Sequence, residues 1–338
     1  PPPPTDTSTT EESSAASDVY KRQELAGYEP RWVEPLRFEY QGKRMAGAPP
    51  ASTAGMLNGM IFNILEHFDL RAMGHYTKSA ESLFIIRRAY EQAQLFTTSF
   101  TADPRTRDVP TELLLSKDFG RQLAQVIKQS EPQTLQQLAA SVSSAPTIAE
   151  EDNYKDPRIY TDTNQLVIVD KDGNWVSMTH TVYGDTFGTG LTVDGVGVNS
   201  GNTFPGAGYG EGRRVITPFP ALMVVDDDGE PLLALGSPGL SSRAVALTLI
   251  NIIGYGMDPY AAVDAPRFTG YERYEPLRIE ARVADEVIDG MRARDVDVNL
   301  SAPYNWHMGS IQLVSRDPQS GELTGVADPR RGGHAEGY

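Results

Sequence analysis

The chain has 338 residues, a formal net charge of −15 and no cysteine. Its length fits a soluble globular protein of one large or two modest domains, and no apolar run approaches the roughly 18 residues that span a bilayer. The acidic balance argues against a nucleic-acid partner, the lack of a long apolar run argues against a membrane partner, and the missing cysteines exclude disulfides, thiol catalysis and cysteine-based metal sites.

Residues 1–23 are rich in Pro, Ser and Thr and contain nothing to bury. This composition predicts a disordered tail, and the stretch lacks the apolar core of a secretory signal. Its end, Asp18-Val19-Tyr20-Lys21-Arg22-Gln23, resembles a translated sequencing-adapter remnant. A non-native tail is therefore the other interpretation of this segment.

The elements predicted between residues 24 and 162 are mostly helical. An alternating strand over residues 36–40 comes first, and Ser52 or Thr53 is then expected to cap a helix with a buried apolar face. Helical spacing predicts two further helices at 79–96 and 111–128. The polar stretch 129–153 is expected to be an exposed linker.

A hairpin follows this linker. Residues 166–169 form a short apolar run that predicts a buried strand, and the Asp-Gly turn at 170–174 leads into a return strand at 175–182. Thr163 and Thr181 would then place two hydroxyls at the same end of an antiparallel pair. Two threonines on a hairpin mean little by themselves, because threonine is common in strands.

Strands and turns dominate the rest of the chain. A hairpin is predicted at 221–235 around a solvated acidic turn, and an apolar helix at 242–254 begins beside the glycine-bearing loop 236–240. The N-terminus of that helix suits an oxyanion, because backbone N–H groups and the positive dipole end meet there. A helix at 284–293 and a last hairpin at 310–326 complete the prediction.

Several short motifs, in this order and at these separations, resemble the γ-glutamyltranspeptidase family over residues 24–338. They are Phe187-Gly188-Thr189-Gly190, Gly236-Ser237-Pro238-Gly239, Ala265-Pro266-Arg267-Phe268, Asp328-Pro329-Arg330 and Glu336-Gly337-Tyr338. The resemblance implies an α+β fold of the N-terminal-nucleophile type. This is an αββα sandwich of two stacked, mainly antiparallel sheets with helices outside, here lacking part of the large-subunit half. Residues 24–162 would be the C-terminal part of the large subunit, and 163–338 the small subunit.

The resemblance also implies a mechanism. The precursor would be cut between Asp162 and Thr163, and the freed α-amine of Thr163, with a pKa of about 8, would activate the hydroxyl beside it. Thr181 would hydrogen-bond the nucleophile region, and the N–H groups of Gly239 and Leu240 would hold the oxyanion. Leu240 departs from the family, which usually has two glycines here, so the loop is expected to be reshaped.

The larger departures concern the acyl group. The substrate-binding candidates are Tyr183, Asn202, Thr203, Thr217 and Ser237. Tyr183 stands where the family has an asparagine, the stretch containing Asn202 and Thr203 lacks the expected aspartate, and Thr217-Pro218 replaces a Ser-Ser pair. Selectivity for a zwitterionic γ-glutamyl group should therefore fall by about 1.5 to 3 kcal/mol.

Three interpretations stay open. The first is γ-glutamyltransferase-type hydrolysis or acyl transfer on a small amide, by a heterodimer cut from one precursor. The second keeps this mechanism for the glutaryl side chain of cephalosporins, poly-γ-glutamate capsule or oxamate. The third is an inactive, truncated relative. The family resemblance implies a periplasmic or secreted protein.

Three more residues and the cofactor question complete the expectations. Arg267 and Arg330 match family signatures, and an ion pair or a ligand contact fits each of them equally well. His307 is expected to be a surface-loop histidine rather than a general base. The five histidines show no ligand spacing, so the sequence predicts no metal and no other cofactor.

Overall fold

The computed structural model describes residues 29–129, 163–181, 216–270 and 276–337, together with the backbone of two short strands, β5 (Thr192–Val193) and β6 (Val196–Gly197). The described residues from 34 onward, apart from β5 and β6, belong to one compact unit, and residues 29–33 with β5 and β6 belong to another. The predicted tail at 1–23 and nearly all of the predicted linker at 129–153 lie outside the described residues.

The strands of the larger unit are β1 (Leu36–Tyr40), β2 (Lys43–Gly47), β3 (Thr163–Val169), β4 (Trp175–Thr181), β7 (Leu222–Val225), β8 (Pro231–Gly236), β9 (Phe268–Thr269), β10 (Leu277–Glu280), β11 (Val298–Ser301), β12 (Gln312–Arg316) and β13 (Leu323–Ala327). Its helices are α2 (Ala54–Leu65), α3 (Leu70–Met73), α4 (Ala80–Phe100), α5 (Thr111–Leu114), α6 (Lys117–Gln129), α8 (Ser241–Leu249), the π-helix η3 (Ile250–Gly254), α9 (Pro259–Asp264), α10 (Asp285–Arg292) and the short 3-10 helix η4 (Trp306–Met308).

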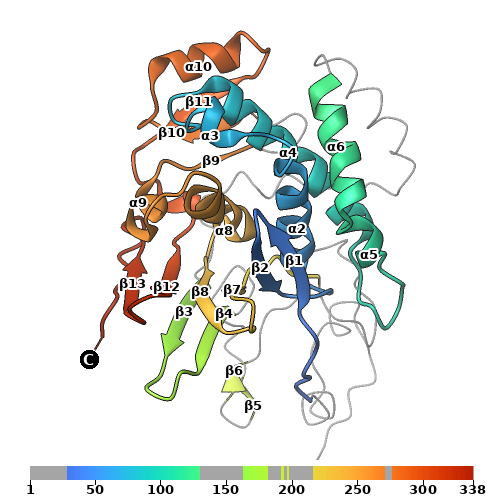
Figure 1. The fold of residues 1–338 in the computed structure, drawn as a ribbon, viewed down its shortest axis with the longest axis vertical. Helices are drawn as coiled ribbons and strands as arrows, with labels where there is room; N and C mark the ends of the chain where they lie inside the picture. Colours follow the sequence, from blue (N-terminus) through green and yellow to red (C-terminus); the bar gives the residue numbers. More distant parts are fainter. Residues whose placement is uncertain are drawn as a thin grey trace, which may run out of the picture. The chain divides into compact units, whose positions relative to one another are not determined.

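Six strands form the central sheet, in the order β1-β2-β7-β8-β12-β13, with every neighbouring pair antiparallel (Figure 1). The hairpins predicted around the acidic turn and at the end of the chain are both part of it, and are confirmed. β2 pairs with β7, with Met45 opposite Val224. One sheet therefore joins residues from before and after Thr163.

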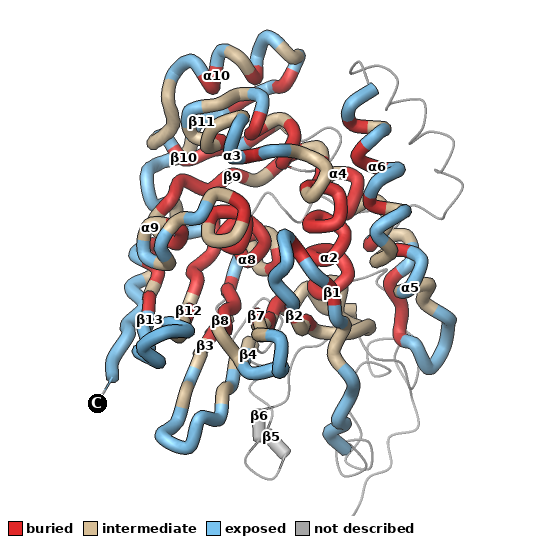
Figure 2. The backbone as a smooth tube through the Cα atoms, in the orientation of Figure 1, coloured by how far each residue is buried: buried red, intermediate tan, exposed pale blue. Residues whose placement is uncertain are grey.

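Helices cover one face of this sheet. Every residue of α2 is buried, and α2 contacts β1, β2 and α8. The sheet residues Leu233, Leu235 and Leu313 belong to the same apolar core as the side chains of α2. Figure 2 shows buried residues along α2, α8 and β8, and exposed residues at the tip of the β3–β4 hairpin. The core is thus a layer of helix and sheet side chains.

The hairpin β3–β4 forms a separate two-stranded sheet that contacts β8 and β12. The side chains of Leu233 and Leu235 point to the helices, whereas Gly236, of the opposite parity, meets the hairpin. Helices and hairpin therefore lie on opposite faces of the central sheet. This arrangement confirms the predicted α+β class with mainly antiparallel sheets, to which β9–β11 add one parallel pair, β10 with β11.

Two predictions about elements are wrong. The strand at 166–169 was expected to be buried, but Ile168 is 55% exposed. The cause is that the polar face of the hairpin, and not this apolar run, turns inward. The helix expected at 111–128 is two helices, α5 and α6. Ser116 separates them, because its hydroxyl accepts a hydrogen bond from the Phe119 N–H and so caps α6.

Candidate active site

The two threonines singled out in the sequence meet at one end of the β3–β4 hairpin. Thr163 and Thr181 are directly opposite in the antiparallel register, and the Thr163 hydroxyl donates to the Thr181 hydroxyl at 3.1 Å. Both residues are partly buried. The predicted juxtaposition of two hydroxyls is confirmed, and the role of Thr163 as a nucleophile stays a prediction.

The same face of the hairpin carries a hydrogen-bonded set of polar side chains that the sequence analysis missed. The Thr179 hydroxyl donates to Gln165 Oε1 at 2.5 Å, and Gln165 Nε2 donates to the Ser177 hydroxyl at 3.0 Å. Ser177 in turn donates to the carbonyl of Leu235 on β8 at 3.0 Å. The alternation of polar residues at 177, 179 and 181 with apolar ones at 176 and 178 was the available signal.

The loop from Ser237 to Leu240 connects β8 to α8. Gly239 has φ +68°, Leu240 is the N-cap of α8 with φ −45°, and Ser241 has φ +53°. The left-handed conformation is thus taken by Gly239 and Ser241, on either side of Leu240, and the β-carbon of Leu240 itself is not strained. The Ser237 hydroxyl is buried, donates to the Pro238 carbonyl and accepts from the Ser310 N–H.

Thr217 and Pro218 lie between the N-termini of two helices. The Thr217 carbonyl accepts from the Thr53 N–H at 2.8 Å, and the Pro218 carbonyl accepts from the hydroxyls of Ser241 and Ser242 at 2.8 and 3.1 Å. Thr217-Pro218 therefore packs beside the start of α8. Its contact with a substrate, like that of Ser237, stays a prediction.

Arg331 covers the other side of the Gly239 loop. Its guanidinium stacks on the Trp306 ring at 3.6 Å, and its Nε donates to the Trp306 carbonyl at 2.9 Å. A β-carbon added to Gly239 would collide with Arg331 Nη2. A cation thus lies against the loop in which the oxyanion was predicted, and the sequence carried no signal for it because 239 and 331 are far apart.

His307 is exposed in the turn η4, as predicted. Partial burial and the nearby Arg331 and Arg278 lower its pKa.

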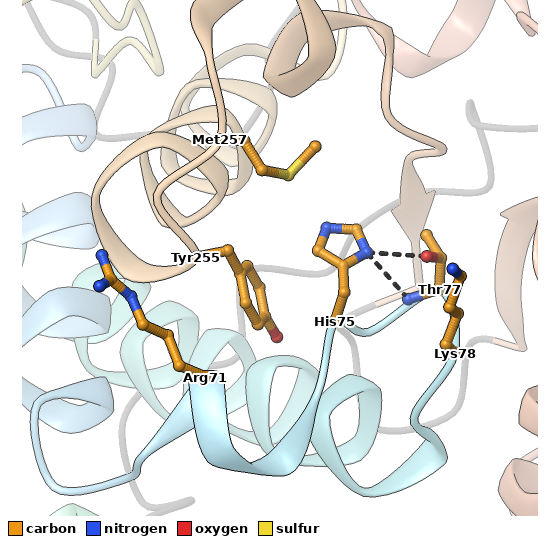
Figure 3. A pocket seen from close by; sticks show the side chains of 6 residues that line it. All are labelled: Arg71, His75, Thr77, Lys78, Tyr255 and Met257. Atoms are coloured by element: carbon orange, nitrogen blue, oxygen red, sulfur yellow. Dashed lines mark hydrogen bonds between the residues drawn. The ribbon is translucent and has the colours of Figure 1, made fainter.

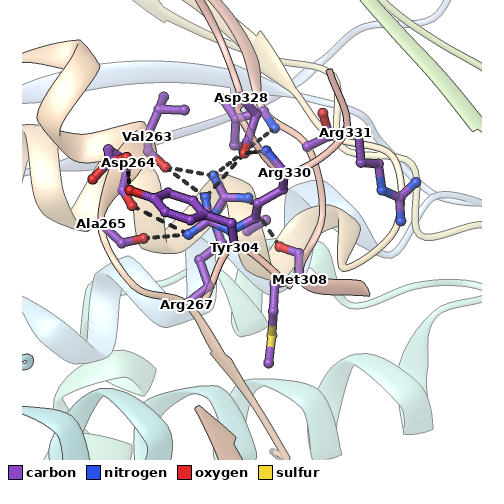
Figure 4. Close-up of polar contacts among 12 residues, drawn as sticks. Val263, Asp264, Ala265, Arg267, Tyr304, Met308, Asp328, Arg330 and Arg331 are labelled. Carbon is purple, nitrogen blue, oxygen red and sulfur yellow. Dashed lines mark hydrogen bonds and ion pairs between the residues drawn. The ribbon is translucent and has the colours of Figure 1, made fainter. Parts of the chain in front are cut away.

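Arg267 and Arg330 are buried in a network of ion pairs (Figure 4). Arg330 Nε and Nη2 each donate to Glu280 at 2.7 Å, and Arg267 pairs with Asp328 at 2.5 Å. Both arginines also donate to carbonyls, Arg267 to that of Met308 and Arg330 to that of Ala265. The structure favours the ion-pair interpretation of both residues.

A separate depression of about 480 Å³ is lined by Arg71, His75, Thr77, Lys78, Tyr255 and Met257 (Figure 3). Burial lowers the pKa of His75, and its ring nitrogens lie 2.7 Å from the Thr77 hydroxyl and 3.2 Å from Asn251 Oδ1. No predicted site residue lines this depression.

Four of the predicted site residues, Asp162, Tyr183, Asn202 and Thr203, lie outside the described residues, as does the Phe187-Gly188-Thr189-Gly190 motif. Among the described residues, no three His, Asp or Glu side chains gather as a metal site, and no helix is long and apolar enough to cross a membrane.

The chain is similar to several known proteins. It is 28% identical over 330 residues to the glutathione hydrolase proenzyme of Escherichia coli (strain K12), covering 91% of this chain and 53% of that protein. It is also 28% identical over 314 residues to the acylase ACY 1 proenzyme of Pseudomonas sp. (strain V22), covering 90% and 52%. The chain thus spans about half the length of the curated relatives it matches.

The fold resembles the crystal structure of the cephalosporin acylase from Bacillus halodurans, with a TM-score of 0.73 and 21% identity over 96% of this chain and 57% of that one. The family model described as gamma-glutamyltranspeptidase matches residues 10–338, so the match begins inside the segment 1–23 that was expected to lie outside the family. This match covers nearly the whole sequence, and the chain belongs to the γ-glutamyltranspeptidase family.

Proposed function

We propose that the chain is an amide hydrolase or acyltransferase that cuts itself before Thr163 and then uses Thr163 as its nucleophile. The observation that carries the proposal is the pair of hydroxyls of Thr163 and Thr181, 3.1 Å apart. They lie on a hairpin that packs against β8, the strand that leads into the Gly239 loop.

Self-cleavage is proposed to use the same groups as catalysis, namely the Thr163 hydroxyl, the N–H groups of Gly239 and Leu240, and water. The Thr163 Oγ attacks the carbonyl carbon of Asp162, and the peptide C–N bond breaks as the proton lost by the hydroxyl is passed to the nitrogen. The result is an ester between Asp162 and the Thr163 hydroxyl, with a free α-amine on Thr163. Water then hydrolyses the ester, which leaves a carboxylate on Asp162 and restores the hydroxyl.

Catalysis repeats the attack on an external amide. The α-amine of Thr163, with a pKa of about 8, takes the proton from the hydroxyl, which adds to the substrate carbonyl. The N–H groups of Gly239 and Leu240 hold the resulting oxyanion, and such donors contribute about 3 to 4 kcal/mol each in other hydrolases. The leaving amine departs with the proton, and water or an amine then takes the acyl group from Thr163.

The two products of the cut are proposed to remain together as a heterodimer. The pairing of β2 with β7 supports this, because a backbone ladder and a shared core join residues on either side of Thr163. Separating the products would expose that core to water.

A second candidate keeps the mechanism and changes the acyl group. One relative of 28% identity is an acylase. Thr217-Pro218 also offers one hydroxyl where the family has two, and proline has no N–H to donate. The acylase relative favours an acyl group without the α-amine of glutamate, and the smaller set of donors at 217–218 is expected to weaken the binding of a carboxylate in either acyl group.

Intact mass tests the proposal. The chain is synthesised in a cell-free system, and its mass is followed with time beside Thr163→Ala and Thr163→Ser. Two fragments that meet at Thr163 are expected for the parent and, more slowly, for Thr163→Ser, with none for Thr163→Ala. A single uncut chain in the parent would overturn the proposal and leave the inactive-relative interpretation.

The acyl group is tested with γ-glutamyl anilide and glutaryl anilide, which differ only in the α-amino group. Faster release of aniline from the glutaryl compound supports the acylase candidate, and the reverse supports the γ-glutamyl enzyme.

A further inference from the structure

Gln165 joins the strand of the proposed nucleophile to the strand that leads into the oxyanion loop. It is 9% exposed, and both ends of its side-chain amide are hydrogen-bonded. The amide nitrogen donates to the Leu166 carbonyl at 3.1 Å and to the Ser177 hydroxyl, while the oxygen accepts from Thr179. The side chain is therefore held in one orientation.

The Gln165 amide lies directly on the backbone of Gly236. A β-carbon added to Gly236 would overlap three atoms of that amide, so only glycine allows this approach. Gly236 is not among the glycines with positive φ. The side chain of Gln165, and not backbone conformation, is thus what excludes larger residues from this position.

This contact has no substitute in the backbone. β3 and β4 form one sheet and β8 belongs to another, so no ladder of main-chain hydrogen bonds joins them. Two contacts link the two sheets near this point, the amide of Gln165 on Gly236 and the hydroxyl of Ser177 on the Leu235 carbonyl. Gln165 is two residues from Thr163 on the same face of β3, and Gly236 is three residues before Gly239.

We propose that Gln165 is a positioning residue, whose amide sets the separation and orientation of the Thr163 hydroxyl relative to the N–H groups of Gly239 and Leu240. The proposal rests on the function proposed above. It follows from the steep dependence of such reactions on geometry, since a displacement of about 1 Å can slow them about 100-fold.

The first variant is Gln165→Met, which keeps the length of the side chain and removes its hydrogen bonds. Self-cleavage measured by intact mass is expected to slow by about 100-fold, and kcat on the better anilide to fall similarly with little change in KM. Gln319→Met, at an exposed turn position, is the matched control and is expected to behave as the parent.

A second variant gives a readout that a merely structural role would not move. Gln165→Glu keeps the acceptor for Thr179 but loses the donor to Ser177 while the carboxyl is ionised. Protonation restores a donor, and burial raises the pKa of a carboxyl. The rate of self-cleavage relative to the parent is therefore expected to rise as pH falls, and a ratio independent of pH would contradict the proposal.

The contact itself is tested by a double-mutant cycle. Gly236→Ala is expected to slow self-cleavage in the parent and to do so much less in a Gln165→Ala background, where the colliding amide is gone. Gly337→Ala, which meets no atom within 4 Å, is the control. Equal effects of Gly236→Ala in both backgrounds would overturn the proposal.

Melting temperatures and circular dichroism accompany each variant. If every slowed variant has also lost its folded structure, Gln165 is a stability residue and the proposal is wrong. An uncut parent overturns the proposed function and this inference together, whereas a cut parent with equally fast Gln165 variants overturns this inference alone.

Discussion

Gly239 shows how two independent constraints select one residue in the candidate oxyanion loop. Its φ of +68° disfavours any side chain, and Arg331 and Gly309 occupy the space that a β-carbon needs. Leu240 tolerates its position because its own φ is negative. The loop therefore keeps both candidate N–H donors although only one glycine of the usual pair is present.

This pair of constraints predicts the effect of Gly239→Ala. Gly332 has a similar φ of +63° but no atom within 4 Å of its added β-carbon, so Gly332→Ala reports the cost of the backbone alone. That cost is about 1 kcal/mol. Gly239→Ala is expected to lower the free energy of unfolding by more than Gly332→Ala does, and also to abolish self-cleavage. Urea unfolding measures the first effect and intact mass the second. Equal effects of the two variants would show that the Arg331 contact is unimportant.

At the scale of elements, the β3–β4 hairpin has two unlike faces. The inward face carries the Gln165 set, and the outward face carries Leu166, Ile168, Val176 and Met178, of which the last three are 44 to 55% exposed. An apolar strand run alone indicates burial. In this hairpin, however, the hydrogen bonds made by Ser177 and Gln165 place the opposite, polar face against the central sheet. An exposed apolar face on a two-stranded element predicts self-association.

Met178→Thr is expected to reduce that association without loss of stability. Threonine suits a strand, and Met178 is exposed, so the free energy of unfolding should change by less than about 0.5 kcal/mol. Light scattering against protein concentration measures the association. Ser177→Val, on the inward face, is the contrasting variant and is expected to destabilise the chain, since it loses the bond to Leu235. Unchanged light scattering in Met178→Thr would show that the outward face of the hairpin does not cause the self-association.

For the whole molecule, the network of Glu280, Asp328, Arg267 and Arg330 ties the last residues of the chain to β10 and α9. Burial by itself raises the pKa of Glu280, but hydrogen bonds from Arg330, Arg267 and Arg282 outweigh this and lower it. The ionised form of Glu280 is therefore more stable, relative to the protonated form, in the folded state than in the unfolded state. Its contribution to stability is complete above the unfolded pKa of about 4.3 and is lost as pH falls through the lower folded pKa.

Glu280→Gln removes one of the two buried carboxylates that pair with Arg330, the other being Asp328, and is expected to lower the free energy of unfolding by about 3 kcal/mol at neutral pH. The variant should also lose the part of the acid dependence below about pH 4.3 that Glu280 supplies. Chemical unfolding at several pH values measures both effects. Glu322→Gln, exposed in the last hairpin, is the control, and equal stability of the two variants would contradict this account.

Local sequence was sufficient to predict the hairpins, most helices, the facing of Thr163 and Thr181, and the family motifs. Each depends on neighbours in the chain, through side-chain period, turn residues and caps. Only the tertiary structure decided which face of the β3–β4 hairpin packs inward, that Gln165 rests on Gly236, and that Arg331 covers Gly239. These contacts join residues about 70 to 90 positions apart, and their selection depends on shape and hydrogen bonding across packed layers, which no local pattern encodes.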